Sequence, residues 1–300
     1  APSAIGLRPR ITIAGTTVAG NDAVGPNPAP IPDTTLPIIG NVALASGGGI
    51  LNDGEGHMTL TDVTISGNKA GDAGGGLNNQ GRATLVATRV KFLDNETHNE
   101  GGGAWSASER LTTIRDSEFS GNDGGVPDLT DPAEPLPVGE PGEARFSTVG
   151  NVAGGGGLYT EGGPVDVSHS TFTGNTATEE GGGISIDNHG DVTIKDSLVT
   201  ENAAGADGGG IENSGFRVTF ERLRVTKNRA TIDGGGIYNS SSNPFFILDT
   251  HVEQNHAQDG GGLANAPDND LIVRGSLFLR NVARHPGISE DGDAEEGGHG

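Results

Sequence analysis

The chain has 300 residues and a formal net charge of −22, because 40 acidic residues face only 18 basic ones. A negative field of this size disfavours binding to nucleic acid and to anionic membranes, so we expect neither as a partner. The sequence has no cysteine, which excludes disulfides, thiolate metal sites and cysteine nucleophiles.

The first residues of the chain bear on where the protein works. The chain does not begin with methionine, and the run from Ala1 to Ala4 looks like a processed start. No apolar stretch of about 18 residues follows, so we expect no membrane insertion. The simplest interpretation is a secreted protein that is extracellular or lies at the cell surface.

A repeat begins with the first expected strand, at residues 11–13, and continues through most of the chain. Glycine triplets recur at intervals of 26 or 27 residues, with one interval of 54. Self-similarity at such a fixed period is typical of a solenoid built from one supersecondary unit. The triplets begin at Gly47, Gly74, Gly101, Gly155, Gly181, Gly208, Gly234 and Gly260.

The residues inside each period predict β-strands. An asparagine precedes each triplet, and the positions ten, eight and three residues before that asparagine are apolar in nearly every repeat. Alternation at the first two positions indicates a half-buried strand, and the later change of parity predicts a bend about six residues before the asparagine. An apolar residue after each triplet begins another short strand. We therefore predict an all-β parallel β-helix of about nine coils, with 26–27 residues and three short strands in each.

The asparagine that marks each repeat has a structural interpretation. Asparagine tolerates left-handed backbone, and its amide can donate to one stacked neighbour while it accepts from another. We predict an internal ladder formed by Asn68, Asn95, Asn122, Asn175, Asn202, Asn228 and Asn255.

Two proline-rich insertions and a tail interrupt the repeat. The insertions span residues 23–40 and 123–150, and the irregular acidic, glycine-rich tail spans residues 282–300. Because each coil of a solenoid contacts only its neighbours, we expect one domain over residues 1–300 with these segments as loops on it. Such loops are either plain surface loops or arms that wall a cleft or reach a neighbouring molecule.

The predicted bend carries charged residues in successive coils, including Asp196, Arg222 and Asp249. In a catalytic interpretation, the two aspartates lie about 9–10 Å apart, near the upper limit for an inverting carboxylate pair, and the arginine holds an acidic sugar. In a structural interpretation, each arginine neutralises the acids above and below it. The pattern also occurs at Asp62, Arg89 and Asp116, which favours the structural interpretation.

A second acidic column directly precedes the glycine triplets. Stacked carboxylates repel one another, and either calcium or solvated side chains that splay apart would relieve that repulsion. We expect no required cofactor, with calcium possible at Glu180, Asp207, Asp233 and Asp259; Glu100 belongs to the same column.

The box Phe-x-x-Asn, as in Phe92 to Asn95 and Phe119 to Asn122, together with Gly-Gly-Gly-Ile/Leu, resembles the repeats of polymorphic outer membrane proteins and related bacterial β-helix proteins. The resemblance implies a right-handed parallel β-helix that works as an extracellular, surface-exposed or adhesive rod. We expect a non-enzymatic protein whose partner is itself, end to end in a filament or within a longer rod, or other surface proteins and glycans. The alternative is a polysaccharide lyase, hydrolase or epimerase with substrate on a stacked face.

Overall fold

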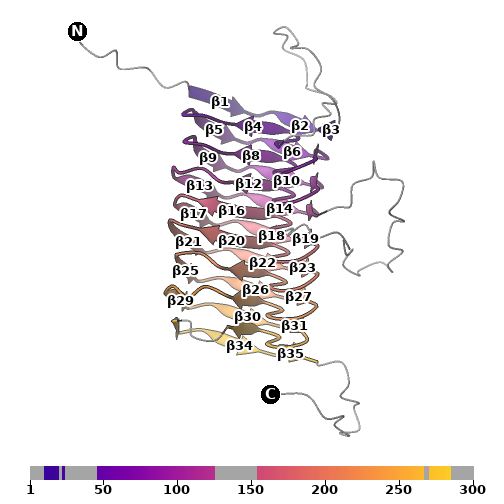
Figure 1. The fold of residues 1–300 in the computed structure, drawn as a ribbon, viewed down its shortest axis with the longest axis vertical. Coiled ribbons are helices and arrows are strands. Elements are labelled where there is room, and N and C mark those ends of the chain that lie inside the picture. The colour runs from indigo at the N-terminus through magenta and orange to yellow at the C-terminus, as the bar shows by residue number, and fades with distance from the viewer. Residues whose placement is uncertain (1–9, 20–21, 24–45, 126–153, 267–269, 285–300) are drawn as a thin grey trace, which may run out of the picture.

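The structure is a computed structural model that describes residues 10–19, 22–23, 46–125, 154–266 and 270–284. These residues form a rod of stacked coils (Figure 1), and every strand pairs in parallel with the equivalent strand of the next coil. In this part of the chain, no helix is long and apolar enough to cross a membrane.

Four sheets run along the rod, and each coil contributes one strand to each sheet in turn. The first sheet has nine strands: β1 (Arg10–Ala14), β5 (His57–Thr61), β9 (Thr84–Thr88), β13 (Thr112–Arg115), β17 (Val165–Ser168), β21 (Asp191–Lys195), β25 (Arg217–Glu221), β29 (Phe245–Leu248) and β33 (Leu271–Arg274). The second sheet has nine strands of three residues: β2 (Thr17–Ala19), β6 (Thr64–Ser66), β10 (Lys91–Leu93), β14 (Glu118–Ser120), β18 (Thr171–Thr173), β22 (Leu198–Thr200), β26 (Arg224–Thr226), β30 (His251–Glu253) and β34 (Leu277–Leu279).

The other two sheets complete each coil. The third sheet has nine strands of two residues: β3 (Asp22–Ala23), β7 (Lys69–Ala70), β11 (Glu96–Thr97), β15 (Asp123–Gly124), β19 (Thr176–Ala177), β23 (Ala203–Ala204), β27 (Arg229–Ala230), β31 (His256–Ala257) and β35 (Val282–Ala283). The fourth sheet has eight strands: β4 (Ile50–Asn52), β8 (Leu77–Asn79), β12 (Ala104–Ser106), β16 (Leu158–Gly162), β20 (Ile184–Asn188), β24 (Ile211–Asn213), β28 (Ile237–Asn239) and β32 (Leu263–Asn265).

The predicted parallel β-helix of about nine coils is confirmed, but the prediction of three strands per coil is wrong. The strands of the third sheet have only two residues, and two residues are too short a run for period-two alternation to be seen in a sequence. The predicted insertions at 23–40 and 123–150 and the tail at 282–300 begin within β3, β15 and β35, and almost all of their other residues lie outside the described ranges.

Residues with left-handed backbone turn the chain at the same place in each coil. At the corner between the first and second sheets, φ lies between 48° and 62° in every coil that is described, for example 51° at Asp196 and 54° at Arg222. The predicted bend six residues before the asparagine is therefore confirmed. We call it the first corner, and its column includes aspartate and glycine, which tolerate this conformation.

Apolar side chains stack in columns inside the coils. Phe92, Phe119 and Phe172 are fully buried, and their rings lie parallel at centroid distances of 4.4 and 4.6 Å. Because equivalent residues contact each other directly, a thin apolar column is enough to close the core of the rod.

An asparagine ladder runs beside this core at the corner between the second and third sheets. The Nδ2 of Asn175 donates to the Oδ1 of Asn202 at 2.9 Å and to the carbonyl oxygen of Phe119 at 3.1 Å, and the Asn175 backbone N–H donates to the same Oδ1. The ladder bonds recur in successive coils and join Asn68, Asn95, Asn122, Asn175, Asn202, Asn228, Asn255 and Asn281.

The glycine corner, which joins the third sheet to the fourth, requires glycine at each of its three positions. In one coil, Gly181 has φ +62°, and a Cβ on Gly183 would meet the Asn202 amide at 3.0 Å. A Cβ on Gly182 would collide with the carbonyl oxygen of Ala203 and would lie 2.6 Å from that of Gly209. Backbone of the next coil thus occupies the space that a side chain would need.

Gly182→Ala tests this packing. We expect a loss of more than about 3 kcal/mol of stability, because backbone cannot move aside as a side chain can. Gly174→Ala is the matched control: it has a left-handed φ of +61° but nothing within 4 Å of an added Cβ, so about 1 kcal/mol is expected. Equal shifts of the denaturant midpoints of the two variants would contradict the conclusion that close backbone packing requires glycine at position 182.

Asn175→Ala tests the ladder. The change removes the buried Oδ1 that accepts from both the Nδ2 and the backbone N–H of Asn122, so we expect a loss of about 3 kcal/mol in denaturant unfolding. Thr173→Ala, in the adjacent strand β18, is the control and should cost less than about 1 kcal/mol.

Candidate functional site

The charged residues of the first corner form an exposed ladder of ion pairs. The Arg222 guanidinium binds Asp196 through two bonds, with Nε to Oδ1 at 2.6 Å and Nη2 to Oδ2 at 2.9 Å, and it also contacts Glu221. Arg89 binds Asp62 in the same way at 2.6 and 2.8 Å. Among the described residues, no ion pair joins Arg222 to Asp249.

This geometry holds the aspartates ionised. The hydrogen bonds from Arg222 lower the pKa of Asp196, and those from Arg89 lower the pKa of Asp62. A carboxyl group with a lowered pKa is a poor general acid, which is the role that an inverting pair requires of one member. Asp196 and Arg222 thus form an ion pair on left-handed backbone, and Asp249 holds the equivalent position in the next coil. The catalytic interpretation of the three residues stays a prediction.

The acidic column before the glycine corner is stacked in register, and no ion pair within the described ranges involves its carboxylates. The backbone of Asp233 forms an isolated parallel β-bridge with the backbone of Asp259 in the next coil. The backbone N–H of Asp233 donates to Asp207 Oδ1 at 2.9 Å. Burial and carboxylate neighbours raise the pKa values of Glu180, Asp207 and Asp233.

The predicted calcium residues thus lie together, yet the part of the chain that the structure describes holds no group of three or more histidine, aspartate or glutamate side chains arranged to bind a metal ion. Calcium at Glu180, Asp207, Asp233 and Asp259 stays a prediction.

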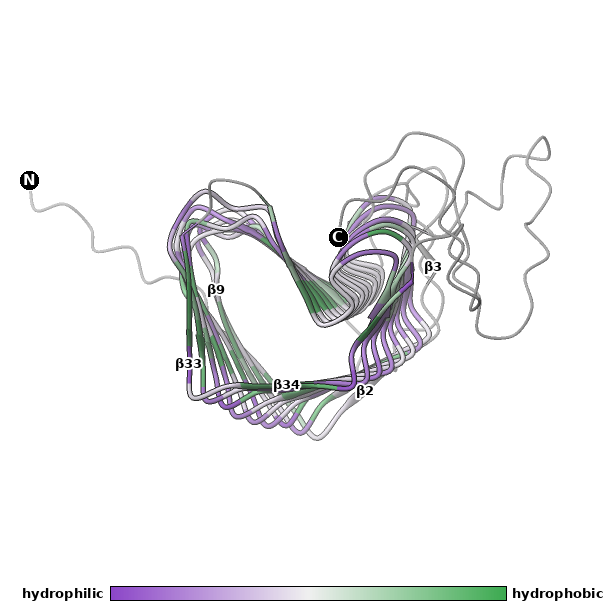
Figure 2. Cartoon of the chain, turned by 90° about the horizontal axis from the view of Figure 1, so that it is seen from below, coloured by the Kyte–Doolittle hydropathy of each residue, from purple (hydrophilic) through white to green (hydrophobic). Residues whose placement is uncertain are grey.

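The outer face of the fourth sheet is sheltered, because the chain folds back at the glycine corner. Viewed along the rod, the coil outline is indented there (Figure 2). The first glycine of each triplet lies close over the outward residue of the strand that follows: a Cβ on Gly181 would meet Ser185 Cβ at 2.7 Å, and one on Gly101 would meet Trp105 Cβ at 2.9 Å.

We call this surface the re-entrant face. Its outward-facing column is formed by the second residue of each strand: Leu51, Asn78, Trp105, Tyr159, Ser185, Glu212, Tyr238 and Ala264. The carboxylates that act electrostatically on this column are Glu100, Glu161, Glu180, Asp187, Asp207 and Asp233.

Glu212 is the most buried carboxyl group of the re-entrant face, with 2% of its surface exposed. Its oxygens accept hydrogen bonds from the hydroxyls of Ser185 at 3.0 Å and Ser240 at 3.1 Å. Burial, together with the negative charge of Glu180, raises the pKa of Glu212 to about 8. Burial together with Glu161 and Asp72 raises the pKa of Glu100 to about 7.

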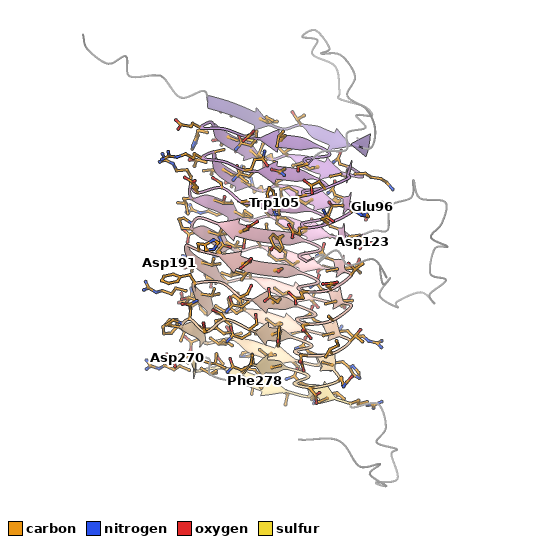
Figure 3. All side chains as sticks on the ribbon, in the orientation of Figure 1. Glu96, Trp105, Asp123, Asp191, Asp270 and Phe278 are labelled. Carbon is orange, nitrogen blue, oxygen red and sulfur yellow. The ribbon has the colours of Figure 1, made fainter. Side chains whose placement is uncertain are left out.

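Two aromatic residues lie between these acids. Trp105 and Tyr159 are register partners in adjacent strands β12 and β16, and both are partly exposed. Burial and the carboxylates around it, Glu100 first among them, raise the pKa of the Tyr159 hydroxyl. Figure 3 labels Trp105 in the N-terminal half of the rod, far from Phe278 at the C-terminal end.

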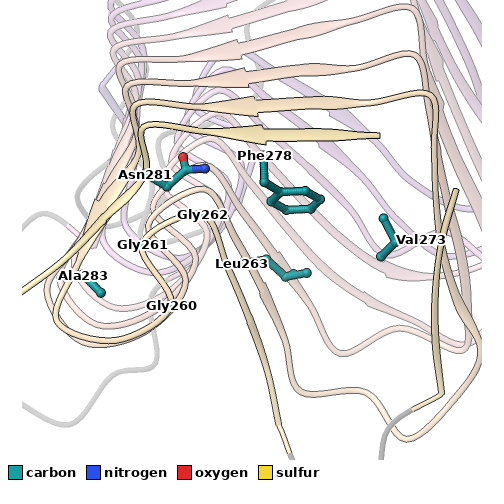
Figure 4. A pocket seen from close by; sticks show the side chains of 8 residues that line it. All are labelled: Gly260, Gly261, Gly262, Leu263, Val273, Phe278, Asn281 and Ala283. Carbon is teal, nitrogen blue, oxygen red and sulfur yellow. The ribbon is translucent and has the colours of Figure 1, made fainter. Parts of the chain in front are cut away.

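The last described coil leaves the core open. A hollow of about 430 Å³ at this end is lined by Leu263, Val273 and Phe278 and by the last glycine corner (Figure 4). Phe278 is 38% exposed and Val273 is 41% exposed, whereas the equivalent Phe172 is fully buried.

Sequence reasoning missed Glu212, Trp105 and Tyr159. It read the first residue of each fourth-sheet strand as apolar but did not follow the next position, where tryptophan, tyrosine and glutamate occur together with leucine, asparagine, serine and alanine. It also missed a second ladder at the third position, where Asn213 donates to Asn239 at 2.7 Å. The pattern Gly-Gly-Gly-x-x-Asn, which recurs in the sequence, is the signal for that ladder.

Comparison with known protein families finds a match. The model described as "Right handed beta helix region" matches residues 48–256, which is more than half of the chain. No curated protein and no solved structure matches the chain significantly.

The raised pKa values predict that alkaline conditions weaken the fold. Because folded Glu100 and Glu212 hold protons that the unfolded chain releases above pH of about 4.5, the free energy of unfolding should fall as the pH rises from about 5 to about 8. Glu212→Gln should make this dependence shallower and raise the melting temperature at pH of about 8 by a few degrees.

Asp62→Asn is the control for this experiment. The pKa of Asp62 is lowered, so its ionisation is complete below this window and the substitution should leave the slope unchanged. A slope that Glu212→Gln also leaves unchanged would contradict the prediction.

Proposed function

The chain belongs to the right-handed β-helix family, and from that premise we propose that it is a non-enzymatic structural protein that associates end to end with other copies or forms part of a longer rod outside the cell. Its work is then mechanical, and no cofactor is required.

The observation that carries the proposal is the open C-terminal end. Strands β33, β34 and β35 are the last in their sheets and have a neighbour on one side only within the described residues. Their apolar residues remain exposed: Leu277 at 46%, Phe278 at 38% and Val282 at 38%. An exposed strand edge beside an apolar patch favours the addition of another strand layer.

The first described coil of a second copy could stack on this C-terminal end, because it has the same strand arrangement as the other coils. Strands β1, β2 and β3 have the lengths and spacing of a β-helix coil, and no described strand pairs with them on the side away from β5, β6 and β7. A second copy placed head to tail would therefore continue three sheets with backbone hydrogen bonds, as β-strand addition does in other assemblies.

Location and other partners are part of the same proposal. The absence of cysteine and the acidic composition are compatible with an extracellular or cell-surface rod, and a net charge of −22 keeps the sides of rods apart while their ends meet. Other surface proteins or glycans are further partners of an adhesive rod.

The alternative, a polysaccharide lyase, hydrolase or epimerase that uses Asp196, Arg222 and Asp249, gains no specific support from the geometry. Asp196 is neutralised by Arg222 in an exposed pair, and family membership alone does not assign chemistry.

Phe278→Asp tests the end contact. Placing a charge in the apolar hollow should weaken self-association at least about tenfold, because a carboxylate would have to be desolvated at the junction. Sedimentation velocity over a concentration series measures the change.

Phe216→Asp is the matched control. Phe216 is 47% exposed on the side of the rod, so the substitution should leave association as in the original chain. Particles that stay monomeric at all concentrations before any substitution would overturn the proposal, and so would equal effects of the two substitutions.

A further inference from the structure

The C-terminal end of this acidic chain carries many of its basic side chains. Eight of the 18 lysine and arginine residues lie within residues 217–284, where the sequence has seven acidic residues. Four of the eight pair with carboxylates. Within the described residues, the other four take part in no ion pair: Arg224, Arg229, Arg274 and Arg284. This end of the rod therefore holds positive charge that the described coils do not neutralise.

Three of these arginines lie with two histidines on the outer side of the second and third sheets. Arg229 and His256 are register partners in β27 and β31, and the backbone N–H of Arg284 donates to a carbonyl oxygen of β31 at 2.9 Å. Arg224 and His251 are register partners in β26 and β30 of the second sheet. His256 is half-buried and the other four are exposed. We call these five side chains the basic patch.

The positive charges of the patch act on one another. Burial, together with the charges of Arg229 and Arg284, lowers the pKa of His256. Both arginines thus lie close enough to disfavour a proton on the imidazole, and no carboxylate of the described coils forms an ion pair with any of the three. An anionic partner would relieve this repulsion.

An acidic segment follows the patch directly in the sequence. After Arg284 the chain continues for 16 residues that lie outside the described ranges. They contain no lysine or arginine and five acids: Glu290, Asp291, Asp293, Glu295 and Glu296. The six residues from Arg284 to Glu290 span up to about 20 Å when extended, whereas the coil of Arg229 is two coil rises, or about 10 Å, away. The acids are therefore within reach of the whole patch.

We propose that residues 285–300 bind the basic patch of their own chain, with their carboxylates beside Arg229, His256 and Arg284. Because the segment is tethered at Arg284, its effective concentration at the patch is of order millimolar. A free polyanion lacks this advantage, and it approaches against the field of a chain with a net charge of −22. The tethered segment is thus the occupant that the charges favour.

The contact has a consequence for assembly, and this consequence rests on the function proposed above. The sides of the rod are acidic over most of its length, so an uncovered basic patch would attract the sides of other rods. When the acidic segment covers the patch, side-on association is suppressed and the rods meet only at their ends.

Histidine-selective NMR titration of the full chain tests the contact. Both chains compared carry Phe278→Asp, which keeps them from stacking. One of them also carries five neutral substitutions: Glu290→Gln, Asp291→Asn, Asp293→Asn, Glu295→Gln and Glu296→Gln. Because carboxylates favour the charged imidazole, His256 should hold its proton about threefold more tightly when the acids are present, and about 1 M salt should remove the difference.

His57, in β5 near the other end of the rod, is the matched control and should titrate alike in the two chains. Equal proton affinity of His256 in both chains would overturn the proposal, and so would an equal change at His57. If added polyglutamate tightened proton binding at His256 while the five substitutions did not loosen it, the patch would belong to an external acidic partner, and the proposal would again be overturned.

Sedimentation velocity of the same two chains at low salt tests the consequence. Loss of the five acids should strengthen side-on association at least about tenfold, and Arg229→Gln with Arg284→Gln should abolish this gain. A gain that survives the loss of both arginines would reflect only the lower net charge and would overturn the inferred role. Failure of the original chain to stack end to end would overturn the proposed function alone, because the His256 comparison uses chains that do not stack.

Discussion

The structure depends on a geometrical constraint, because every coil must turn at the same places with residues that accept left-handed backbone. Glycine supplies this conformation at the glycine corner, but at the first corner it is held by Asp62, Arg89 and Asp196, among others. A single residue of this kind costs of order 1 kcal/mol, and the cost recurs in each coil. Parallel pairing with both neighbouring coils, together with the buried asparagine ladder, offsets it. The registry of the coils is therefore the cause of stability, and the local conformations follow from it.

The sequence predicted the features that recur at the same position in every coil, but not the features that differ from coil to coil. The asparagine column, the apolar columns and the bend could be read directly, because identical positions carry similar residues. The outer face of the fourth sheet could not be read in this way, because Asn78, Trp105 and Glu212 share a position without sharing a chemistry. Burial at an outward position arises from the fold-back at the glycine corner, and periodicity holds no information about which outer face lies in an indentation.

Two acidic columns with the same spacing behave in opposite ways for this reason. At the convex first corner, Asp196 meets an arginine from the next coil, remains exposed to water and has a lowered pKa. Beside the glycine corner, Asp207 meets a carboxylate from the next coil, is partly buried and has a raised pKa. Sequence spacing alone does not distinguish the two columns. Solvent access and the sign of the charge on the equivalent residue of the next coil decide which column holds negative charge without a cationic partner.

The amide-to-amide hydrogen bonds of the asparagine ladder all point the same way. Each amide donates toward the C-terminal coils, as Asn228 does to Asn255 and Asn255 does to Asn281. The ladder therefore has a direction along the rod, and the two ends of the rod differ. Two equivalent ends related by a twofold axis could not continue the amide-to-amide bonds, whereas head-to-tail stacking continues them and does not close on itself.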